Sequence, residues 1–248
     1  MANPFDVGSC RLAEVAGFSA VATTSAGLAA TLGRSDMSVS RDELLAHVRE
    51  LAHATTLPLS VDGEQCFPRE PGGVSETARQ LVDAGASGFS IEDWNSDDGV
   101  IEDLGQAAEN VALAAAVANE HGLVLTARAE NFAMGIDDLD DTIARLCAYR
   151  DAGAHVVFAP GLRDVSSVAR IVKEVGLPVN VLLTPGGPGR EEWEAIGVGR
   201  LSAGSSLLRS AYGAMFATAQ TLLATGALPA DGMYLDQGVA DEAFREAR

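Results

Sequence analysis

The stretch LPLSVDGEQCFPREPGGVSETARQLVDAGASGFSIED, residues 57–93, decides the fold prediction. It contains two short apolar runs, at 57–64 and 88–93, separated by a segment of helical periodicity at 75–84. A strand, a helix and a second strand in this order form a βαβ unit, in which the two strands lie parallel in one sheet. The region therefore predicts an α/β protein with a parallel sheet.

The same alternation continues on both sides of this unit. Further strands are predicted at 20–25, 123–129, 155–160, 178–183 and 200–204, and further helices at 41–52, 104–120, 138–152, 166–175, 191–196 and 207–224. The phrase DAGA, at 83–86 and 151–154, precedes a strand both times and predicts a repeated helix-to-strand turn. Seven strands exceed what a flavodoxin-like doubly wound sheet usually needs. We therefore predict a (β/α)8 TIM barrel, with residues 1–248 as a single domain.

The two ends of the chain are less regular. A short first strand at 3–7, before a helix at 9–16, would supply the eighth strand; alternatively, the bottom of the barrel is closed differently. After Pro229 the sequence predicts a helix at 236–248 that either docks on a neighbouring subunit or frays.

Composition narrows the range of partners. The net charge of −18 argues against a nucleic-acid surface and against an anionic membrane surface, because both need a cationic patch. Small molecules and other copies of the chain are the expected partners. The three cysteines have no paired spacing, and neither an export signal nor a run of about 18 apolar residues is found. A cytoplasmic location is therefore expected.

Charged residues follow the apolar runs where three predicted strands end. Asp62 and Glu64 are two positions apart and share a face, Glu92 ends the next strand, and the carboxyl ends of barrel strands meet at one mouth. Carboxylates this close repel one another unless a cation joins them, and Mg²⁺ takes one or two directly and holds the rest through water. We predict a Mg²⁺ site, with Mn²⁺ as a substitute; the alternative is that these are solvated loop acids in a chain that has 35 of them.

Arg128 lies in an otherwise apolar strand, where an unpaired cation would be unfavourable. It is either an ion-pair partner of Glu64 or Glu92, or a residue whose planar guanidinium binds a substrate carboxylate.

VDGE, IED and TARAE resemble the isocitrate lyase and phosphoenolpyruvate mutase superfamily, and the resemblance covers nearly the whole chain. The opening NPFDVGSCRLAEVAGFSAVATTSAGLAATLGRSD and the later FAPGL, PVNVL, PGGPG and RLSAGSSLLRSAYGAM occur in the family's order. The resemblance implies a Mg²⁺-dependent barrel that acts on small 2-oxo or 2-hydroxy acids, through an enolate or at a P–C bond. It implies that Asp62 is the direct metal ligand, that Glu64 and Glu92 hold metal-bound waters, and that Arg128 binds the substrate carboxylate.

The resemblance also implies roles for residues outside the acidic strand ends. Thr24, Ser25 and Ala26 would form a turn whose hydroxyl and N–H groups bind the substrate, and Asn180 of PVNVL would be a further substrate-binding residue. Asp36 matches a family acid near the site, so that Thr24, Asp36 and Arg128 are the catalytic candidates. Homo-oligomers, tetramers or dimers that exchange their C-terminal helices, are implied as well.

Two departures from the family pattern limit the assignment of a reaction. The loop DWNSDDGVIEDLG, at 93–105, lacks the cysteine of the family's KKCGH-like loop, so ordinary isocitrate cleavage is not expected. The usual Gly-Tyr-Gly is replaced by Gln65, Cys66 and Phe67, where Cys66 is either a small buried residue or a proton donor.

Three functions remain open on the sequence. The leading one is a Mg²⁺-dependent lyase that cleaves or decarboxylates a small 2-oxo or 2-hydroxy (di)carboxylate through an enolate. The second is a mutase or hydrolase of phosphoenolpyruvate or phosphonopyruvate. The third is a binding protein that has lost catalysis.

Overall fold

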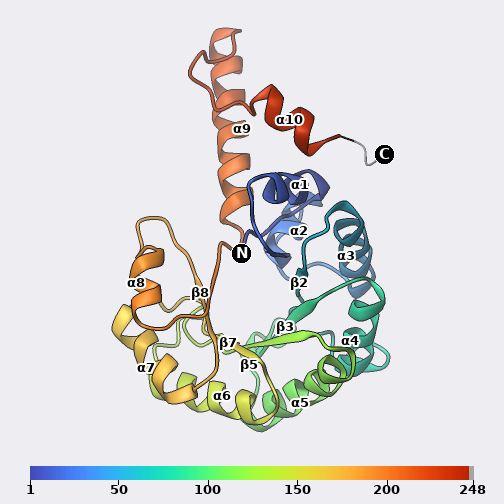
Figure 1. The fold of residues 1–248 in the computed structure, drawn as a ribbon, viewed down its shortest axis with the longest axis vertical. Coiled ribbons are helices and arrows are strands. Elements are labelled where there is room, and N and C mark those ends of the chain that lie inside the picture. The colour runs from blue at the N-terminus through green and yellow to red at the C-terminus, as the bar shows by residue number, and fades with distance from the viewer. Residues whose placement is uncertain (246–248) are drawn as a thin grey trace.

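A computed structural model describes residues 1–245 and contains a nearly closed barrel of seven parallel strands with helices outside it (Figure 1). The strands pair in the order β1-β2-β3-β6-β7-β8-β9. Their bounds are β1 Val21–Ala22, β2 Leu59–Asp62, β3 Gly88–Glu92, β6 Val124–Arg128, β7 Val156–Phe158, β8 Val179–Leu182 and β9 Arg200–Ser202. All seven predicted strands are confirmed, each shorter than its apolar run, and β1 has only two residues where six were predicted.

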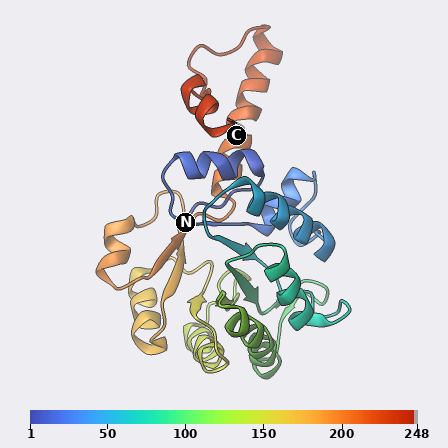
Figure 2. The ribbon, with the colours of Figure 1, turned by 45° about the vertical axis from the view of Figure 1, so that its right-hand side comes forward.

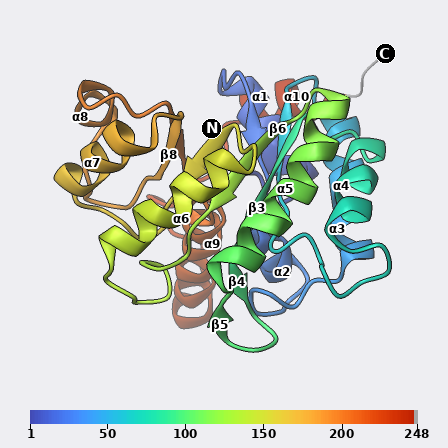
Figure 3. The same ribbon diagram turned by 90° about the horizontal axis from the view of Figure 1, so that it is seen from below.

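The described part of the chain has ten helices, most of which cover the outer face of the barrel (Figure 3). They are α1 Val7–Val15, α2 Ser25–Thr31, α3 Arg41–Ala54, α4 Gly73–Asp83, α5 Leu104–His121, α6 Leu139–Asp151, α7 Val165–Val175, α8 Arg190–Ala195, α9 Ser206–Thr225 and α10 Gln237–Ala243. The repeated DAGA phrase is the predicted turn at the ends of α4 and α6. Gly85 and Gly153 have φ of 97° and 104°, values that favour glycine, and the next residue in each case leads into a strand.

The N-terminal segment takes the place of an eighth strand. Ala2 forms an isolated parallel bridge with Val21 of β1, and the amino group of Met1 donates to the carbonyl of Leu201 in β9, 2.5 Å away. The predicted strand at 3–7 is wrong, because Asp6 accepts a hydrogen bond from the backbone N–H of Ser9 and so begins α1. The barrel is closed by a single-residue bridge rather than by a full strand.

Two elements were not predicted from the sequence. The first is the short helix α2, which Thr24 caps directly after β1, so that its first residue, Ser25, fell within the strand predicted at 20–25. The second is an antiparallel hairpin of β4 Trp94–Asn95 and β5 Val100–Ile101 in the loop after β3. The buried Asn95 side chain accepts hydrogen bonds from the N–H groups of Asp97 and Asp98, which fixes the hairpin turn.

Helices α9 and α10 project from the barrel (Figure 2). Only Leu208 of α9 is buried, whereas α10 packs against α1. The helix predicted at 236–248 is found as α10, and residues 246–248 lie outside the described part. No helix within residues 1–245 is long and apolar enough to cross a membrane.

The interior of the barrel is unusually polar. Many barrels fill this space with bulky branched side chains. Here small polar side chains alternate with apolar residues that face the helices, and they line a cavity of about 220 Å³. They are Ser60, Ser90, Thr126, Asn180 and Ser202. The fold thus leaves room for a small ligand between the strands.

Candidate active site

The cavity is lined by most of the residues that the sequence singled out. Its lining includes Thr24, Ser25, Ala26, Asp36, Asp62, Arg128 and Asn180. Two of the predicted metal residues lie beside it instead. Glu64 lines a neighbouring cavity of about 390 Å³, and the Glu92 side chain, only 6% exposed, contacts Arg128.

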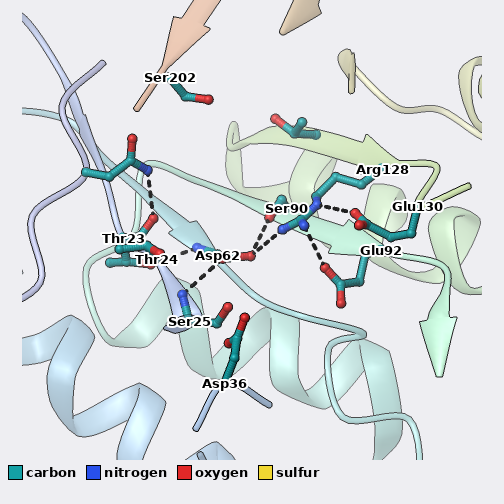
Figure 4. Close-up of polar contacts among 12 residues, drawn as sticks. Thr23, Thr24, Ser25, Asp36, Asp62, Ser90, Glu92, Arg128, Glu130 and Ser202 are labelled. Atoms are coloured by element: carbon teal, nitrogen blue, oxygen red, sulfur yellow. Dashed lines mark hydrogen bonds and ion pairs between the residues drawn. The ribbon is translucent and has the colours of Figure 1, made fainter. Parts of the chain in front are cut away.

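Asp62 is the polar centre of the cavity wall (Figure 4). Its Oδ2 accepts a hydrogen bond from the backbone N–H of Ser25, 3.0 Å away, at the start of α2. Its Oδ1 accepts one from the Ser90 hydroxyl at 3.3 Å and one from Arg128 Nη1 at 2.8 Å. A carboxylate offers about four lone-pair sites, and three are used here. Asp62 therefore keeps capacity for one more partner.

Arg128 ends β6 and joins three carboxylates. Its guanidinium contacts Asp62, Oε2 of Glu92 at 3.0 Å and Oε1 of Glu130 at 2.7 Å, and it lies 5.5 Å from the centre of the Phe158 ring. The ion pair with Glu92 is confirmed. Since three of the five N–H donors are used, two remain for a ligand.

The surroundings of Arg128 hold more negative than positive charge. Four carboxyl groups, those of Asp62, Glu64, Glu92 and Glu130, lie around this one guanidinium. Burial, together with the charge of Asp62, raises the pKa of Glu64 to about 8. Burial likewise raises the pKa of Glu92 and of Glu130, and Arg128 only partly offsets this. A further cation would relieve the repulsion.

The donor set fits a cation that keeps most of its water. Within residues 1–245, no three Asp, Glu, His or Cys side chains are arranged to ligate one metal ion together. Mg²⁺ does not require such a cluster, because it usually binds through one or two carboxylates and retains several waters. The remaining lone-pair site of Asp62 and the excess of carboxylates suit an ion of this kind.

Cys66 lies next to this cluster and is packed rather than presented to the cavity. The residue is fully buried, its Sγ lies 3.8 Å from the carbonyl oxygen of Ser90, and burial raises the pKa of its thiol. These contacts support the role of a small buried residue over that of a reactive thiol.

Several polar residues of the cavity were not predicted from the sequence, among them Ser90, Thr126, Arg200 and Ser202. The first two precede Glu92 and Arg128 by two positions on the same strands. A period of two places them on the same face as those charged residues. This spacing was the available signal.

Residues 1–223 match the family model described as phosphoenolpyruvate phosphomutase. The chain belongs to this family. A putative lyase/mutase from Burkholderia cenocepacia J2315 is 41% identical, with a TM-score of 0.91 over 97% of this chain and 88% of that chain. The nearly closed barrel is therefore a fold that this chain shares with the lyase/mutase.

The chain is also similar to curated relatives that are named as a lyase and as a decarboxylase. The 2-methylisocitrate lyase of Escherichia coli is 27% identical over 70% of this chain and 61% of its own length. The oxaloacetate decarboxylase of Paraburkholderia xenovorans is 29% identical over 76% of this chain and 64% of its length. The chain therefore spans about three fifths of the length of these relatives.

Proposed function

We propose that the protein is a Mg²⁺-dependent lyase that cleaves or decarboxylates a small 2-oxo or 2-hydroxy (di)carboxylate through an enolate. The observation that carries the proposal is the cluster of four carboxyl groups around Arg128, of which Asp62 lines a small polar cavity together with Arg128. The names of the curated relatives, a 2-methylisocitrate lyase and an oxaloacetate decarboxylase, support C–C chemistry.

In this proposal Asp62 holds the metal directly, and Glu64 and Glu92 hold it through water. When bound, Mg²⁺ supplies a Lewis acid for the negative charge that develops on the substrate oxygen. The Ala26 N–H group at the start of α2 and the two remaining donors of Arg128 orient the substrate carboxylate, while the Ser25 N–H donates to Asp62. Removing one well-placed donor of this type costs about 3 kcal/mol, roughly a hundredfold in rate.

The remaining predicted residues have defined places in the cavity. Thr24 caps α2 through Oγ1, which accepts the Gly27 N–H at 3.4 Å, and so positions the Ser25 and Ala26 amides. Asp36 lies on the loop after α2, beside Ser25 in the view of Figure 4, and lines the same cavity. Asn180 lies deeper, on β8. We assign Thr24 and Asp36 to catalysis together with Arg128, and Asn180 to substrate binding.

Phosphorus–carbon chemistry on the same scaffold is the second candidate. It is favoured by the family model and by the lyase/mutase relative. The loop at 93–105 also contains no Cys, Lys or His, residues that the isocitrate reaction would require there. A ³¹P NMR assay with phosphonopyruvate distinguishes the two candidates. Loss of the phosphonate resonance, without turnover of oxaloacetate or alkyl malates, would favour phosphorus–carbon chemistry. Failure to turn over any of these substrates, despite binding, would favour a binding protein.

The first prediction concerns oxalate, which mimics the pyruvate enolate. We expect isothermal titration calorimetry to show oxalate binding in the presence of Mg²⁺, and at least a tenfold weaker affinity after treatment with EDTA. The physical reason is that an anion meets the excess of carboxylates unless a divalent cation offsets them. Equal affinity with and without the metal would contradict the proposed site. Mn²⁺ in place of Mg²⁺ is expected to restore binding.

We further propose that α9 mediates self-association into a dimer or tetramer. Large apolar side chains of α9 are exposed, including Met215 at 63% and Phe216 at 61%. Those of Met233 and Tyr234 in the following segment lie across a cavity of about 540 Å³ from α9. A monomer rarely leaves such a surface uncovered.

The second prediction tests this surface. Phe216→Glu is expected to shift the protein towards a monomer in light scattering after size exclusion, because burial of one Phe side chain contributes roughly 1.5–3 kcal/mol. That loss weakens association by about tenfold to a hundredfold for each side chain. Val100→Glu is the control, since Val100 is also exposed, at 52%, but lies on the β4–β5 hairpin. An unchanged mass for Phe216→Glu would rule out this face.

A further inference from the structure

Arg200 places a second guanidinium inside the barrel, away from the carboxylate cluster. It begins β9 and pairs in register with Asn180 of β8. Its Nε donates to Oδ1 of Asn180 at 2.8 Å, and its Nη2 donates to Oγ1 of Thr126 at 3.0 Å. All three residues line the same cavity as Asp62.

The charge of Arg200 has no partner within the described chain. Arg128 and Arg145, two other guanidinium groups held inside the fold, each contact at least two carboxylates. In residues 1–245, Arg200 makes no ion pair, and burial lowers its pKa to about 10. An unpaired cation in the interior is unfavourable unless a ligand brings the opposite charge. Three of its five N–H donors are not used by the protein.

Arg200 lies deeper in the barrel than Arg128, and this distance limits the length of a ligand that contacts both. Its partner Thr126 precedes Arg128 by two residues on β6, which corresponds to roughly 7 Å along a strand. Around this level the lining consists of hydroxyl and amide side chains, such as Ser90 and Ser202, and the two acids of the lining, Asp36 and Asp62, come from the loop after α2 and the end of β2. An anionic group here would meet one cation and neutral hydrogen-bond donors.

We propose that Arg200 binds a second carboxylate of the substrate, while the 2-oxo or 2-hydroxy acid end binds at Asp62. This inference rests on the proposed function and narrows its substrate class to short dicarboxylates. It makes Arg200 a residue that determines specificity. A dicarboxylate bound between Asp62 and Arg200 also explains why the barrel interior is lined with small polar side chains, since bulky side chains would occupy the space that the ligand needs.

Matched pairs of ligands test the inference in the wild-type protein. In the presence of Mg²⁺, each ligand displaces oxalate in a calorimetric competition. The pairs are 2-oxoglutarate against 2-oxovalerate, and malate against 2-hydroxybutyrate; each pair differs by a terminal carboxylate in place of a methyl group. We expect the dicarboxylate to bind at least tenfold more tightly in one or both pairs. Equal affinities within both pairs would overturn the inference without requiring any variant.

Two variants assign the preference to Arg200. Arg200→Gln keeps hydrogen-bonding capacity towards Asn180 and Thr126 but removes the charge, and it is expected to reduce the preference to less than threefold. Arg200→Lys is expected to retain part of it. Oxalate is too short to span both ends, and its affinity is expected to stay within threefold in both variants. An unreduced preference in Arg200→Gln would overturn the inference.

Failure of the proposed function gives a different result. If oxalate does not bind the wild-type protein, the metal site and the Arg200 inference fail together. If oxalate binds with Mg²⁺ but the terminal carboxylate has no effect, only the Arg200 inference fails. Arg200 also borders a smaller cavity of about 170 Å³ near Met1, at the other end of the strands. A small free anion is therefore added in a further competition. If it weakens the binding of dicarboxylates and of methyl-ended ligands equally, the inference is also overturned.

Discussion

Replacing Arg128 with methionine is expected to lower the free energy of unfolding by about 3–5 kcal/mol, because it leaves buried charges without their partner. Arg128 contacts Asp62, Glu92 and Glu130, and the side chains of the two glutamates are only 6% and 2% exposed. Without the guanidinium, three carboxylates face one another with little solvent. Denaturant unfolding followed by circular dichroism measures the loss.

The loss should depend on pH in a defined direction. Burial already raises the pKa of Glu92 and of Glu130, and Arg128 lowers both. In Arg128→Met the two pKa values rise further, so the folded state binds protons that the unfolded state has released. Stability of the variant then falls as pH rises above the pKa of an unfolded carboxyl group, about 4.3. We expect a smaller deficit relative to wild type at pH 5 than at pH 8.

Arg190→Met is the control for Arg128→Met. Arg190 pairs with Glu194 on α8, but the two side chains are 79% and 54% exposed. Exposed pairs contribute between about 0 and 1 kcal/mol, so this variant should unfold almost like wild type at both pH values. Equal, small effects of the two replacements would show that Arg128 does not hold the cluster together.

Replacing Asp62 with alanine is expected to abolish Mg²⁺-dependent oxalate binding while the protein still folds. The variant removes the proposed direct ligand, and Ser25 and Ser90 lose their acceptor. Arg128 keeps Glu92 and Glu130 as partners, so no buried cation is left unpaired. We expect at least a hundredfold loss of oxalate affinity in calorimetry and of turnover of any substrate found.

Asp97→Ala provides the matched control for Asp62→Ala. Asp97 is 64% exposed and pairs with Arg69 at the tip of the β4–β5 hairpin, outside the cavity lining that contains Asp62. It should bind oxalate like wild type. Retention of full Mg²⁺-dependent binding by Asp62→Ala would mean that the metal, if bound, is held elsewhere.

Much of the fold could be predicted because its signals are local. The alternation of apolar runs with helical segments placed all seven strands, and the DAGA turns marked where helices α4 and α6 end. The errors arose where a local signal was weak or ambiguous. The α2 helix is short and follows β1 directly; the predicted strand at 20–25 took in its first residue, Ser25, and no element was predicted at 26–31. The N-terminal strand at 3–7 was overridden by the Asp6 cap.

The sequence by itself determined that three strands end in Asp62, Glu92 and Arg128, because apolar runs that stop at charged residues mark strand ends. It did not determine the place of Glu64, which lies beyond β2 with a φ of 49° and lines a different cavity from Asp62. Only the tertiary structure decided which of these groups contact one another. Arg128 binds Asp62 from 66 positions away and Arg200 binds Thr126 from 74 positions away. Such distances depend on how seven strands pair and curve, and burial then sets the energy of each charge. For this reason the charged strand ends could be predicted, but the unpaired cation at Arg200 could not.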